Sequence, residues 1–359
     1  MRNLQKILAL ALALIMSFSL VVTANAAFSD EADITDTYNE AVNVLSQLEV
    51  FKGYTDGTYQ PQKSITRAEV AAIIYRIATG DVTDTQVSIY SDWNRFTDVH
   101  AGEWWAGYIN YCANAEYIKG YGNGKFGPDD PVTGYEALAM ILRAVGYGKM
   151  DGEFQGSDWA VQTAARANSL KVTRNVQNTA LLNSAATREL VAELLCQASL
   201  VPTVEYNQFS GYSENDESLA KRSFDMERLE GVVMANEYAD LEDDDTLANG
   251  KTRLDVDGRD VTLNVTSDLT AIGESRYAYV RKTSNNDYDM VCSKLYDTGK
   301  NVINETGAAK DKVKDLGDAK SIKTVDVTEY FIHFDPDSSI WSSDWRIAYA
   351  IPTTALEAN

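Results

Sequence analysis

Apolar residues in the first half of the chain follow helical spacing and are interrupted by short polar loops. Ala41, Val44 and Leu45, with Leu48, occupy positions i, i+3, i+4 and i+7 of one helix face. A second apolar run spans residues 70–75. The pattern therefore predicts two helices joined by a loop within residues 27–80.

The same loop occurs twice. Lys52-Gly53-Tyr54 recurs 67 residues later as Lys119-Gly120-Tyr121. At this offset the two copies align without a gap. A third copy, shifted by 54 residues from the second, has no glycine in its loop. We therefore expect three repeats, at residues 27–80, 95–148 and 149–200. One such unit cannot bury its own apolar faces, so the three should pack on one another.

A start signal precedes the second helix of each repeat. A threonine followed three residues later by glutamate has the spacing of a capping box, in which each side chain bonds the other residue's backbone. The third copy keeps the threonine, but its acid, Glu189, comes one residue early. The predicted helix caps are Thr66, Glu69, Thr133, Glu136 and Thr187.

After residue 200 the pattern changes. Residues 201–225 are polar and mixed, which predicts a linker. Thr252, Leu254 and Val256 then alternate before an Asp-Gly turn, and similar runs follow near 261–265, 276–282, 288–294 and 325–334. Residues 308–319 fit a short helix or a loop. We expect an α + β multidomain protein, with an N-terminal three-repeat helical bundle and an all-β sandwich or barrel over residues 226–359.

The N-terminus has the pattern of an export signal. Arg2 and Lys6 precede an apolar run over residues 7–22, and Ala24-Asn25-Ala26 is a small-residue cleavage site. The alternative is a permanent membrane anchor, but the run is short for a spanning helix. We therefore predict a signal peptide at residues 1–26 and a secreted chain that has no membrane contact after cleavage.

Charge and cysteine content narrow the function further. The formal charge is −21, and loss of Arg2 and Lys6 takes it to −23, which disfavours nucleic-acid binding. Three cysteines with no close pair predict small buried side chains instead of a disulfide framework. The acidic run 243–245 suits a solvated loop better than a calcium site. We expect no metal and no cofactor.

Several of these motifs resemble the S-layer homology repeat. The resemblance rests on Phe28-Ser29-Asp30, on residues 65–69 (Ile-Thr-Arg-Ala-Glu), on residues 96–99 and on Trp104-Trp105. It implies a pseudo-three-fold helical bundle that binds secondary cell-wall polysaccharide, typically through sugars that carry a pyruvate ketal. The ligand-binding positions that we expect on this basis are Arg67, Arg188, Asp30, Asp98, Lys52, Gly53, Tyr54, Gly120 and Tyr121.

The chemistry of the first helical position fits an acidic sugar. Arg67 follows the cap, where a guanidinium can grip a carboxylate while free helix N–H groups face the same anion. Arg188 holds this position in the third repeat, whereas Gly134 replaces it in the second. Two other readings of Arg67 stay open: an exposed helix-start residue, or an ion pair with Asp30.

Aromatic side chains are the other candidates for sugar contact. Tyr54 and Tyr121, with Tyr59 and Phe126, flank the loops, whereas the tryptophans 104, 105 and 159 fit a core role better. The expected function is a wall-anchored surface protein whose C-terminal half is displayed or assembles a lattice. The alternative is a wall-anchored glycan hydrolase with paired carboxylates in that half.

Overall fold

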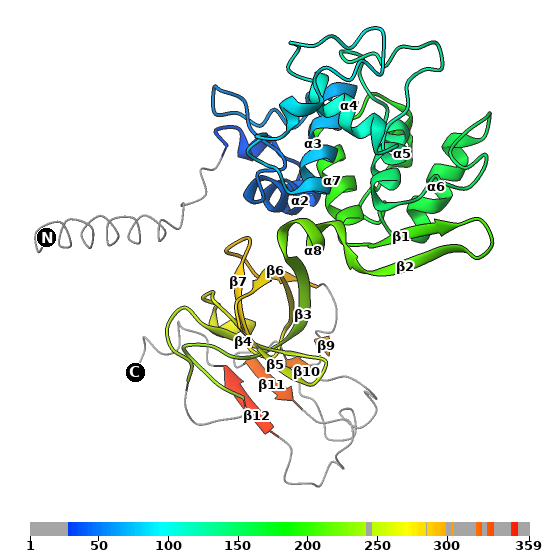
Figure 1. The fold of residues 1–359 in the computed structure, drawn as a ribbon. Helices are drawn as coiled ribbons and strands as arrows, with labels where there is room; N and C mark the ends of the chain where they lie inside the picture. Colours follow the sequence, from blue (N-terminus) through cyan, green and yellow to red (C-terminus); the bar gives the residue numbers. More distant parts are fainter. Residues whose placement is uncertain are drawn as a thin grey trace, which may run out of the picture.

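The computed structural model describes residues 28–241, 246–284 and 286–298, together with the backbone of four further strands. The predicted signal peptide, the acidic run 243–245 and the segment 308–319 lie outside the described residues. The described chain has an α + β fold, with helices in one half and a β-barrel in the other (Figure 1).

The helical half is built from six α-helices. They are α2 (Asp36–Gln47), α3 (Arg67–Thr79), α4 (Ala106–Asn114), α5 (Gly134–Val145), α6 (Trp159–Ser169) and α7 (Arg188–Ser199). Three-residue to five-residue 3-10 turns, η2 (Glu31–Asp33), η3 (Val87–Tyr90) and η4 (Thr179–Asn183), lie in the connecting segments. Helix α4 packs on α3, α6 packs on α5, and α2 packs on α7. Each unit therefore completes its core with a helix of another unit.

A closed ring of backbone hydrogen bonds joins the segments that precede α3, α5 and α7. The amide of Ile65 donates to the carbonyl of Ala186 at 3.0 Å, the amide of Ala186 to Val132 at 2.8 Å, and the amide of Val132 to Ile65 at 3.1 Å. The ring satisfies polar groups that would otherwise be buried without partners. It also places the first turns of the three helices side by side.

The predicted threonines cap the N-termini of α3, α5 and α7. The side chains of Thr66 and Thr133 accept from the amides of Glu69 and Glu136, and each glutamate carboxylate accepts from the amide of its threonine. Thr187 accepts from the amide of Leu190. The misplaced acid of the third unit, Glu189, instead accepts from the amide and hydroxyl of Thr35 at 2.9 and 2.8 Å.

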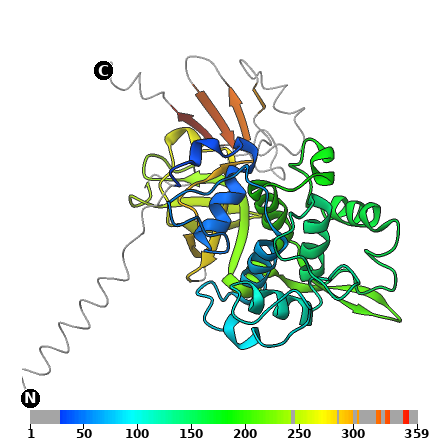
Figure 2. The same ribbon diagram turned by 90° about the horizontal axis from the view of Figure 1, so that it is seen from above.

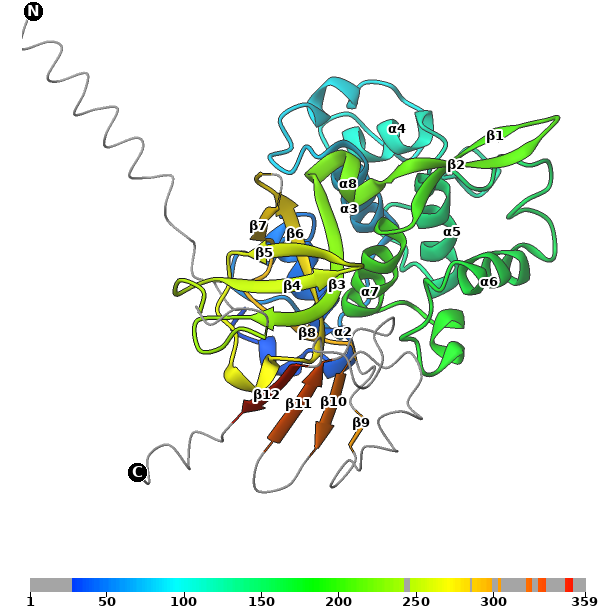
Figure 3. The same ribbon diagram turned by 90° about the horizontal axis from the view of Figure 1, so that it is seen from below.

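The segment 201–225 is not the linker that its polarity suggests. It forms a hairpin of β1 (Pro202–Asn207) and β2 (Gly211–Ser218), followed by helix α8 (Leu219–Phe224). Val204 and Leu219 are buried, and Ser218 caps α8. The strands carry polar residues because one face of the hairpin is exposed, and its tip projects beyond α6 (Figures 1 and 3).

The second half contains a closed barrel. Strands β3 (Met226–Ala235), β4 (Thr252–Val256), β5 (Arg259–Leu263), β7 (Asp287–Met290) and β6 (Ser275–Lys282) are neighbours in that order, and β6 pairs again with β3. Strand β8 (Tyr296–Asp297) pairs antiparallel with β6, and the 3-10 turn η5 (Leu269–Ala271) precedes β6. Closure removes the exposed sheet edges. Of the two predicted architectures, this part of the chain is a barrel.

A separate four-stranded sheet follows the barrel. Its order is β12-β11-β10-β9, from strands β9 (Ile303–Asn304), β10 (Ser321–Thr324), β11 (Glu329–His333) and β12 (Arg346–Ala350). Strand β11 lies within the run that the sequence predicts as a long strand. The region after residue 226 therefore contains two sheets.

Helices α2 and α7 meet the barrel. The hydroxyls of Tyr277 and Tyr279 on β6 both donate to the carboxylate of Glu40 on α2 (Figure 2 shows the two halves in contact). Cys196 and Cys292 are buried close to this contact, and Cys112 is buried within the helical half. All three are free thiols, as predicted. No helix among the described residues is long and apolar enough to cross a membrane.

Candidate functional site between the helical units

Arg67 lies at a junction between two units. Its Nε donates to the carbonyl of Phe126 at 2.8 Å and its Nη2 to the carbonyl of Lys119 at 2.9 Å. The guanidinium also lies over the rings of Tyr121 and Phe126, at 4.7 and 4.6 Å from their centroids. Arg67 is only 4% exposed. It is therefore neither an exposed helix-start residue nor a partner of Asp30.

Arg188 repeats this geometry at the next junction. Its Nε donates to the carbonyl of Tyr59 at 2.8 Å and its Nη2 to that of Lys52 at 3.0 Å. It lies over the ring of Tyr54 at 4.7 Å. Each arginine also approaches a capping glutamate, Arg67 to Glu136 at 3.7 Å and Arg188 to Glu69 at 3.8 Å.

The third junction lacks the arginine because the space is already filled. A Cβ atom on Gly134 would lie 2.6 Å from the Cα of Leu182, which belongs to η4. Only glycine allows the two backbones to approach this closely. The third junction is thus a packing contact.

The expectation of free helix N–H groups is wrong. The amides of Arg67 and Ala68 donate to the carbonyls of Asp130 and Pro128, both at 3.0 Å. The amide of Arg188 likewise donates to Lys63 at 3.0 Å. The neighbouring loop satisfies the first turn, so any anion here must be held by side chains.

A cavity of about 590 Å³ opens beside Arg67. Helix α5 supplies one wall, the loop 119–122 a second, and the start of the third unit a third. Lys119 and Arg143 add positive charge to that of Arg67, while Glu136 is the acid in the lining. The cavity also exposes part of Trp159. The other residues that line it are Gly120, Tyr121, Gly122, Ala139, Met140, Phe154, Gln155 and Gly156.

Arg143 is the most unusual of these charges. It is 7% exposed, its Nη2 donates to the carbonyl of Phe154 at 3.2 Å, and its buried Nε has no hydrogen-bond partner. Burial, followed by repulsion from Arg67, lowers the pKa of Arg143 to about 10. Burial and then Arg143 also lower the pKa of Lys119. The cavity is therefore lined by three cations and one acid, and the Arg143 side chain is buried in its wall.

The predicted aspartates hold loops. Asp30 accepts from the amides of Tyr59 and Gln60 at 2.7 and 2.8 Å, and Asp98 accepts from those of Phe126 and Gly127, both at 2.8 Å. Gly53 and Gly120 lie against the rings of Phe28 and Phe96, where a Cβ would approach to 2.6 Å. A direct role of these four residues in ligand binding stays a prediction.

The aromatic candidates divide by exposure. Tyr59 and Phe126 are fully buried, so neither can stack on a sugar. Tyr121 is 50% exposed at the rim of the cavity and donates to Asp130 at 2.9 Å. Tyr54 is half-buried and its hydroxyl donates to Glu69 at 3.3 Å. Of the tryptophans expected in the core, Trp104 is instead 54% exposed.

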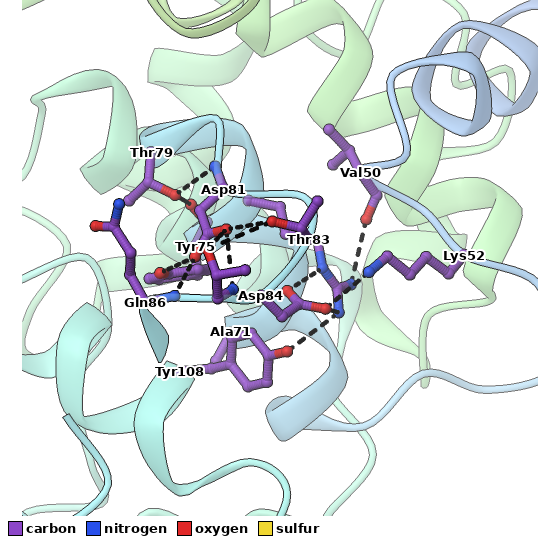
Figure 4. Close-up of polar contacts among 12 residues, drawn as sticks. Val50, Lys52, Ala71, Tyr75, Thr79, Asp81, Thr83, Asp84, Gln86 and Tyr108 are labelled. Carbon is purple, nitrogen blue, oxygen red and sulfur yellow. Dashed lines mark hydrogen bonds and ion pairs between the residues drawn. The ribbon is translucent and has the colours of Figure 1, made fainter. Parts of the chain in front are cut away.

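The sequence does not single out Arg143 or Asp84, and it favours a core role for Trp159. The offset of 67 residues pairs Arg76 with Arg143, and this equivalence was the available signal. Asp84 lies in the segment between the first two units, which the repeats do not cover. Figure 4 shows its carboxylate between the ammonium of Lys52 and the end of a neighbouring arginine side chain.

Comparisons with known proteins agree with these repeated motifs. The model of the S-layer homology domain matches residues 27–71 and 95–138. A middle cell wall protein of Brevibacillus brevis is 29% identical over 79% of this chain and 26% of its own length. A surface layer protein of Brevibacillus choshinensis is 29% identical over 57% and 17%, and a cell surface protein of Thermoanaerobacter kivui 29% over 74% and 32%.

The chain spans less than a third of the length of each of these relatives. The matched residues include the capped starts of α3 and α5 and the loop 119–122 beside the Arg67 cavity. Over residues 27–71 and 95–138, therefore, the chain is similar to the S-layer homology domain.

Proposed function

We propose that this chain is a secreted surface protein that holds itself to the bacterial cell wall by binding wall polysaccharide between its helical units. The observation that carries the proposal is the cavity beside Arg67, where three cations face one space in a strongly acidic protein. The relatives named as cell-wall and surface-layer proteins support this location.

We further infer that the helical half consists of three S-layer homology repeats around an approximate three-fold axis. The backbone ring through Ile65, Val132 and Ala186 supports this arrangement, as does the cyclic pairing of first and second helices. The third repeat, residues 149–200, diverges where it contacts the rest of the chain.

The ligand that fits the cavity is an acidic sugar, such as one with a pyruvate ketal. Nε and Nη2 of Arg67 already donate to carbonyls, so the outer edge of its guanidinium is the part left for a ligand. A carboxylate there would make charge-assisted hydrogen bonds in a partly dehydrated space. Tyr121 and Trp159 line the same space and offer ring faces for the sugar.

Residues 226–359 are then the part that the anchor displays. The hydrolase alternative requires two facing carboxylates in a cleft, whereas strands β3 to β7 close on themselves. Lattice assembly by this region stays a prediction, which sedimentation equilibrium of the secreted chain would test.

Sedimentation with purified cell walls tests the anchor. We expect the chain that begins at Ala27 to sediment with intact walls and to stay in solution with walls stripped of secondary polysaccharide. Arg67→Ala should reduce sedimentation, whereas Arg95→Ala, at an exposed arginine, should not. Equal sedimentation with intact and stripped walls would contradict the proposal.

A further inference from the structure

The first two units place an arginine and a lysine at equivalent positions. Arg76 in α3 corresponds to Arg143 in α5, and Lys52 corresponds to Lys119. Both arginines lie in the last turn of their helix, and both lysines open the loop of their unit. What differs is the acid available to each pair.

In the first unit, Asp84 neutralises the pair. Its Oδ1 accepts from Nε of Arg76 at 2.9 Å, and its Oδ2 accepts from Nη2 of Arg76 at 3.0 Å and from Nζ of Lys52 at 2.7 Å (Figure 4). The hydroxyl of Tyr108 completes the cluster, since it lies 3.3 Å from Nη2 of Arg76.

The pKa values of Arg76 and Asp84 reflect these contacts. Burial would lower the pKa of Arg76, but the hydrogen bonds that Arg76 donates to Asp84 outweigh burial and raise that pKa. Burial would likewise raise the pKa of Asp84, but Arg76 and Lys52 lower it.

In the second unit, the corresponding pair faces the cavity without such an acid. Among the described residues, no carboxylate forms an ion pair with Arg143 or Lys119, and Nε of Arg143 is buried without a hydrogen bond. Glu136, the acid in the cavity wall, is held by the amide and hydroxyl of Thr133 at 2.8 and 2.9 Å. Buried donors of this kind are normally satisfied.

We propose that Lys119 and Arg143 form an anion subsite in the Arg67 cavity, and that an acidic group of the ligand takes the place that Asp84 takes in the first unit. The inference rests on the proposed function and adds the residues that select a negatively charged group of the ligand. The first unit is closed to the same group because its own carboxylate occupies the position. The Arg67 cavity is therefore the acid-binding one of the two arginine junctions.

The chemistry of the ligand group follows from the Asp84 cluster. Two cationic side chains there share one carboxylate, with three donors directed at two oxygens. A sugar carboxylate or a phosphate meets the same requirement. A neutral glycan leaves Nε of Arg143 unsatisfied.

Titration calorimetry with polysaccharide released from purified walls tests the subsite. Arg143→Gln should weaken binding about ten-fold or more, because a charge-assisted bond is lost. Lys119→Gln should also weaken binding. Because the Lys119 side chain is exposed, this change should not affect folding. Arg76→Gln is the matched control and should change affinity less than two-fold. Pyruvate and inorganic phosphate, added as competitors, identify which acid the subsite accepts.

Two reciprocal variants sharpen the test. Asp84 has a φ of 57°, so Asp84→Gly removes the carboxylate without backbone strain and should open a second anion site. Gln155→Glu should supply an internal acid to the Arg67 cavity and weaken binding. A stoichiometry that rises with Asp84→Gly supports the assignment, and an unchanged stoichiometry contradicts it.

Failure of the subsite differs from failure of the anchor. Wild-type chain that does not bind wall polysaccharide overturns the proposed function itself. The subsite alone is overturned if the wild-type chain binds and the Arg143→Gln and Lys119→Gln variants melt normally and bind equally well.

Discussion

Helices α5 and α7 occupy equivalent positions in the second and third units, yet their outward faces serve different purposes. The offset of 54 residues pairs Ala139 with Glu193 and Arg143 with Gln197. In α5 this face borders the open cavity, whereas in α7 it is buried where the helical half meets the barrel. Equivalent helix faces thus border an open cavity in α5 and pack against the barrel in α7.

The exchange of side chains explains the difference. A small alanine and an arginine leave room for an anion and attract it. Glu193 instead accepts from Asn175 at 2.8 Å beside Glu40, which the barrel tyrosines hold. Burial, opposed by bonds from Asn175 and Gln197 and reinforced by Glu40, raises the pKa of Glu193 to about 7. Acidity in the third unit therefore disfavours an acidic ligand there.

The largest effect should come from filling the glycine junction. Gly134→Ala places a Cβ against the backbone of Leu182, which cannot move like a side-chain end, and should cost about 3 kcal/mol or more. Urea unfolding measures the loss, with Asp129→Ala at an exposed loop position as the control. A loss below about 1 kcal/mol would mean that this junction is not packed as described.

Replacing Glu193 should change the pH dependence of folding. A carboxyl whose folded pKa is raised to about 7 binds more protons when folded, so its contribution falls as pH rises from about 4.5 to 7. Glu193→Gln should therefore raise stability by up to about 3 kcal/mol at pH 8 and change little at pH 4. Melting at both pH values measures this, and an equal effect at both would count against a raised pKa.

The two arginine junctions should contribute similarly to stability. Arg67→Ala and Arg188→Ala each leave two loop carbonyls without their donors, which should cost about 2 kcal/mol in either case. Denaturant unfolding of both variants compares them directly. A large loss in one and none in the other would break the equivalence of the junctions.

Removal of a helix cap should have the smallest effect. Thr66→Ala and Thr133→Ala each lose a capping box and should destabilise the chain by about 1 kcal/mol. Thr187→Ala loses a single side-chain bond and should cost less. Thermal melts of the three variants rank them, and a larger loss at Thr187 would reverse the expected order.

Local signals in the sequence predict much of this fold. Threonine–glutamate spacing predicts the starts of α3 and α5, and alternation predicts β4 and β5 on either side of the Asp257-Gly258 turn. These features depend on residues close together in the chain. The hairpin β1–β2 escapes the same reasoning because its polar residues resemble those of a linker.

The site is predicted less completely because it depends on contacts between distant segments. The repeats place Arg67 and Arg188 at equivalent positions and Gly134 at the third such position. They cannot show that neighbouring carbonyls occupy the helix amides, nor that Asp84 reaches the pair in the first unit. Such pairings follow only from how the units close around the backbone ring.

The most direct test is diffraction from crystals of the secreted chain soaked in polysaccharide released from purified walls. We predict an acidic sugar in the Arg67 cavity, with its anionic group between the side chains of Lys119 and Arg143. Sugar bound elsewhere, with this cavity empty at saturating ligand, would contradict it.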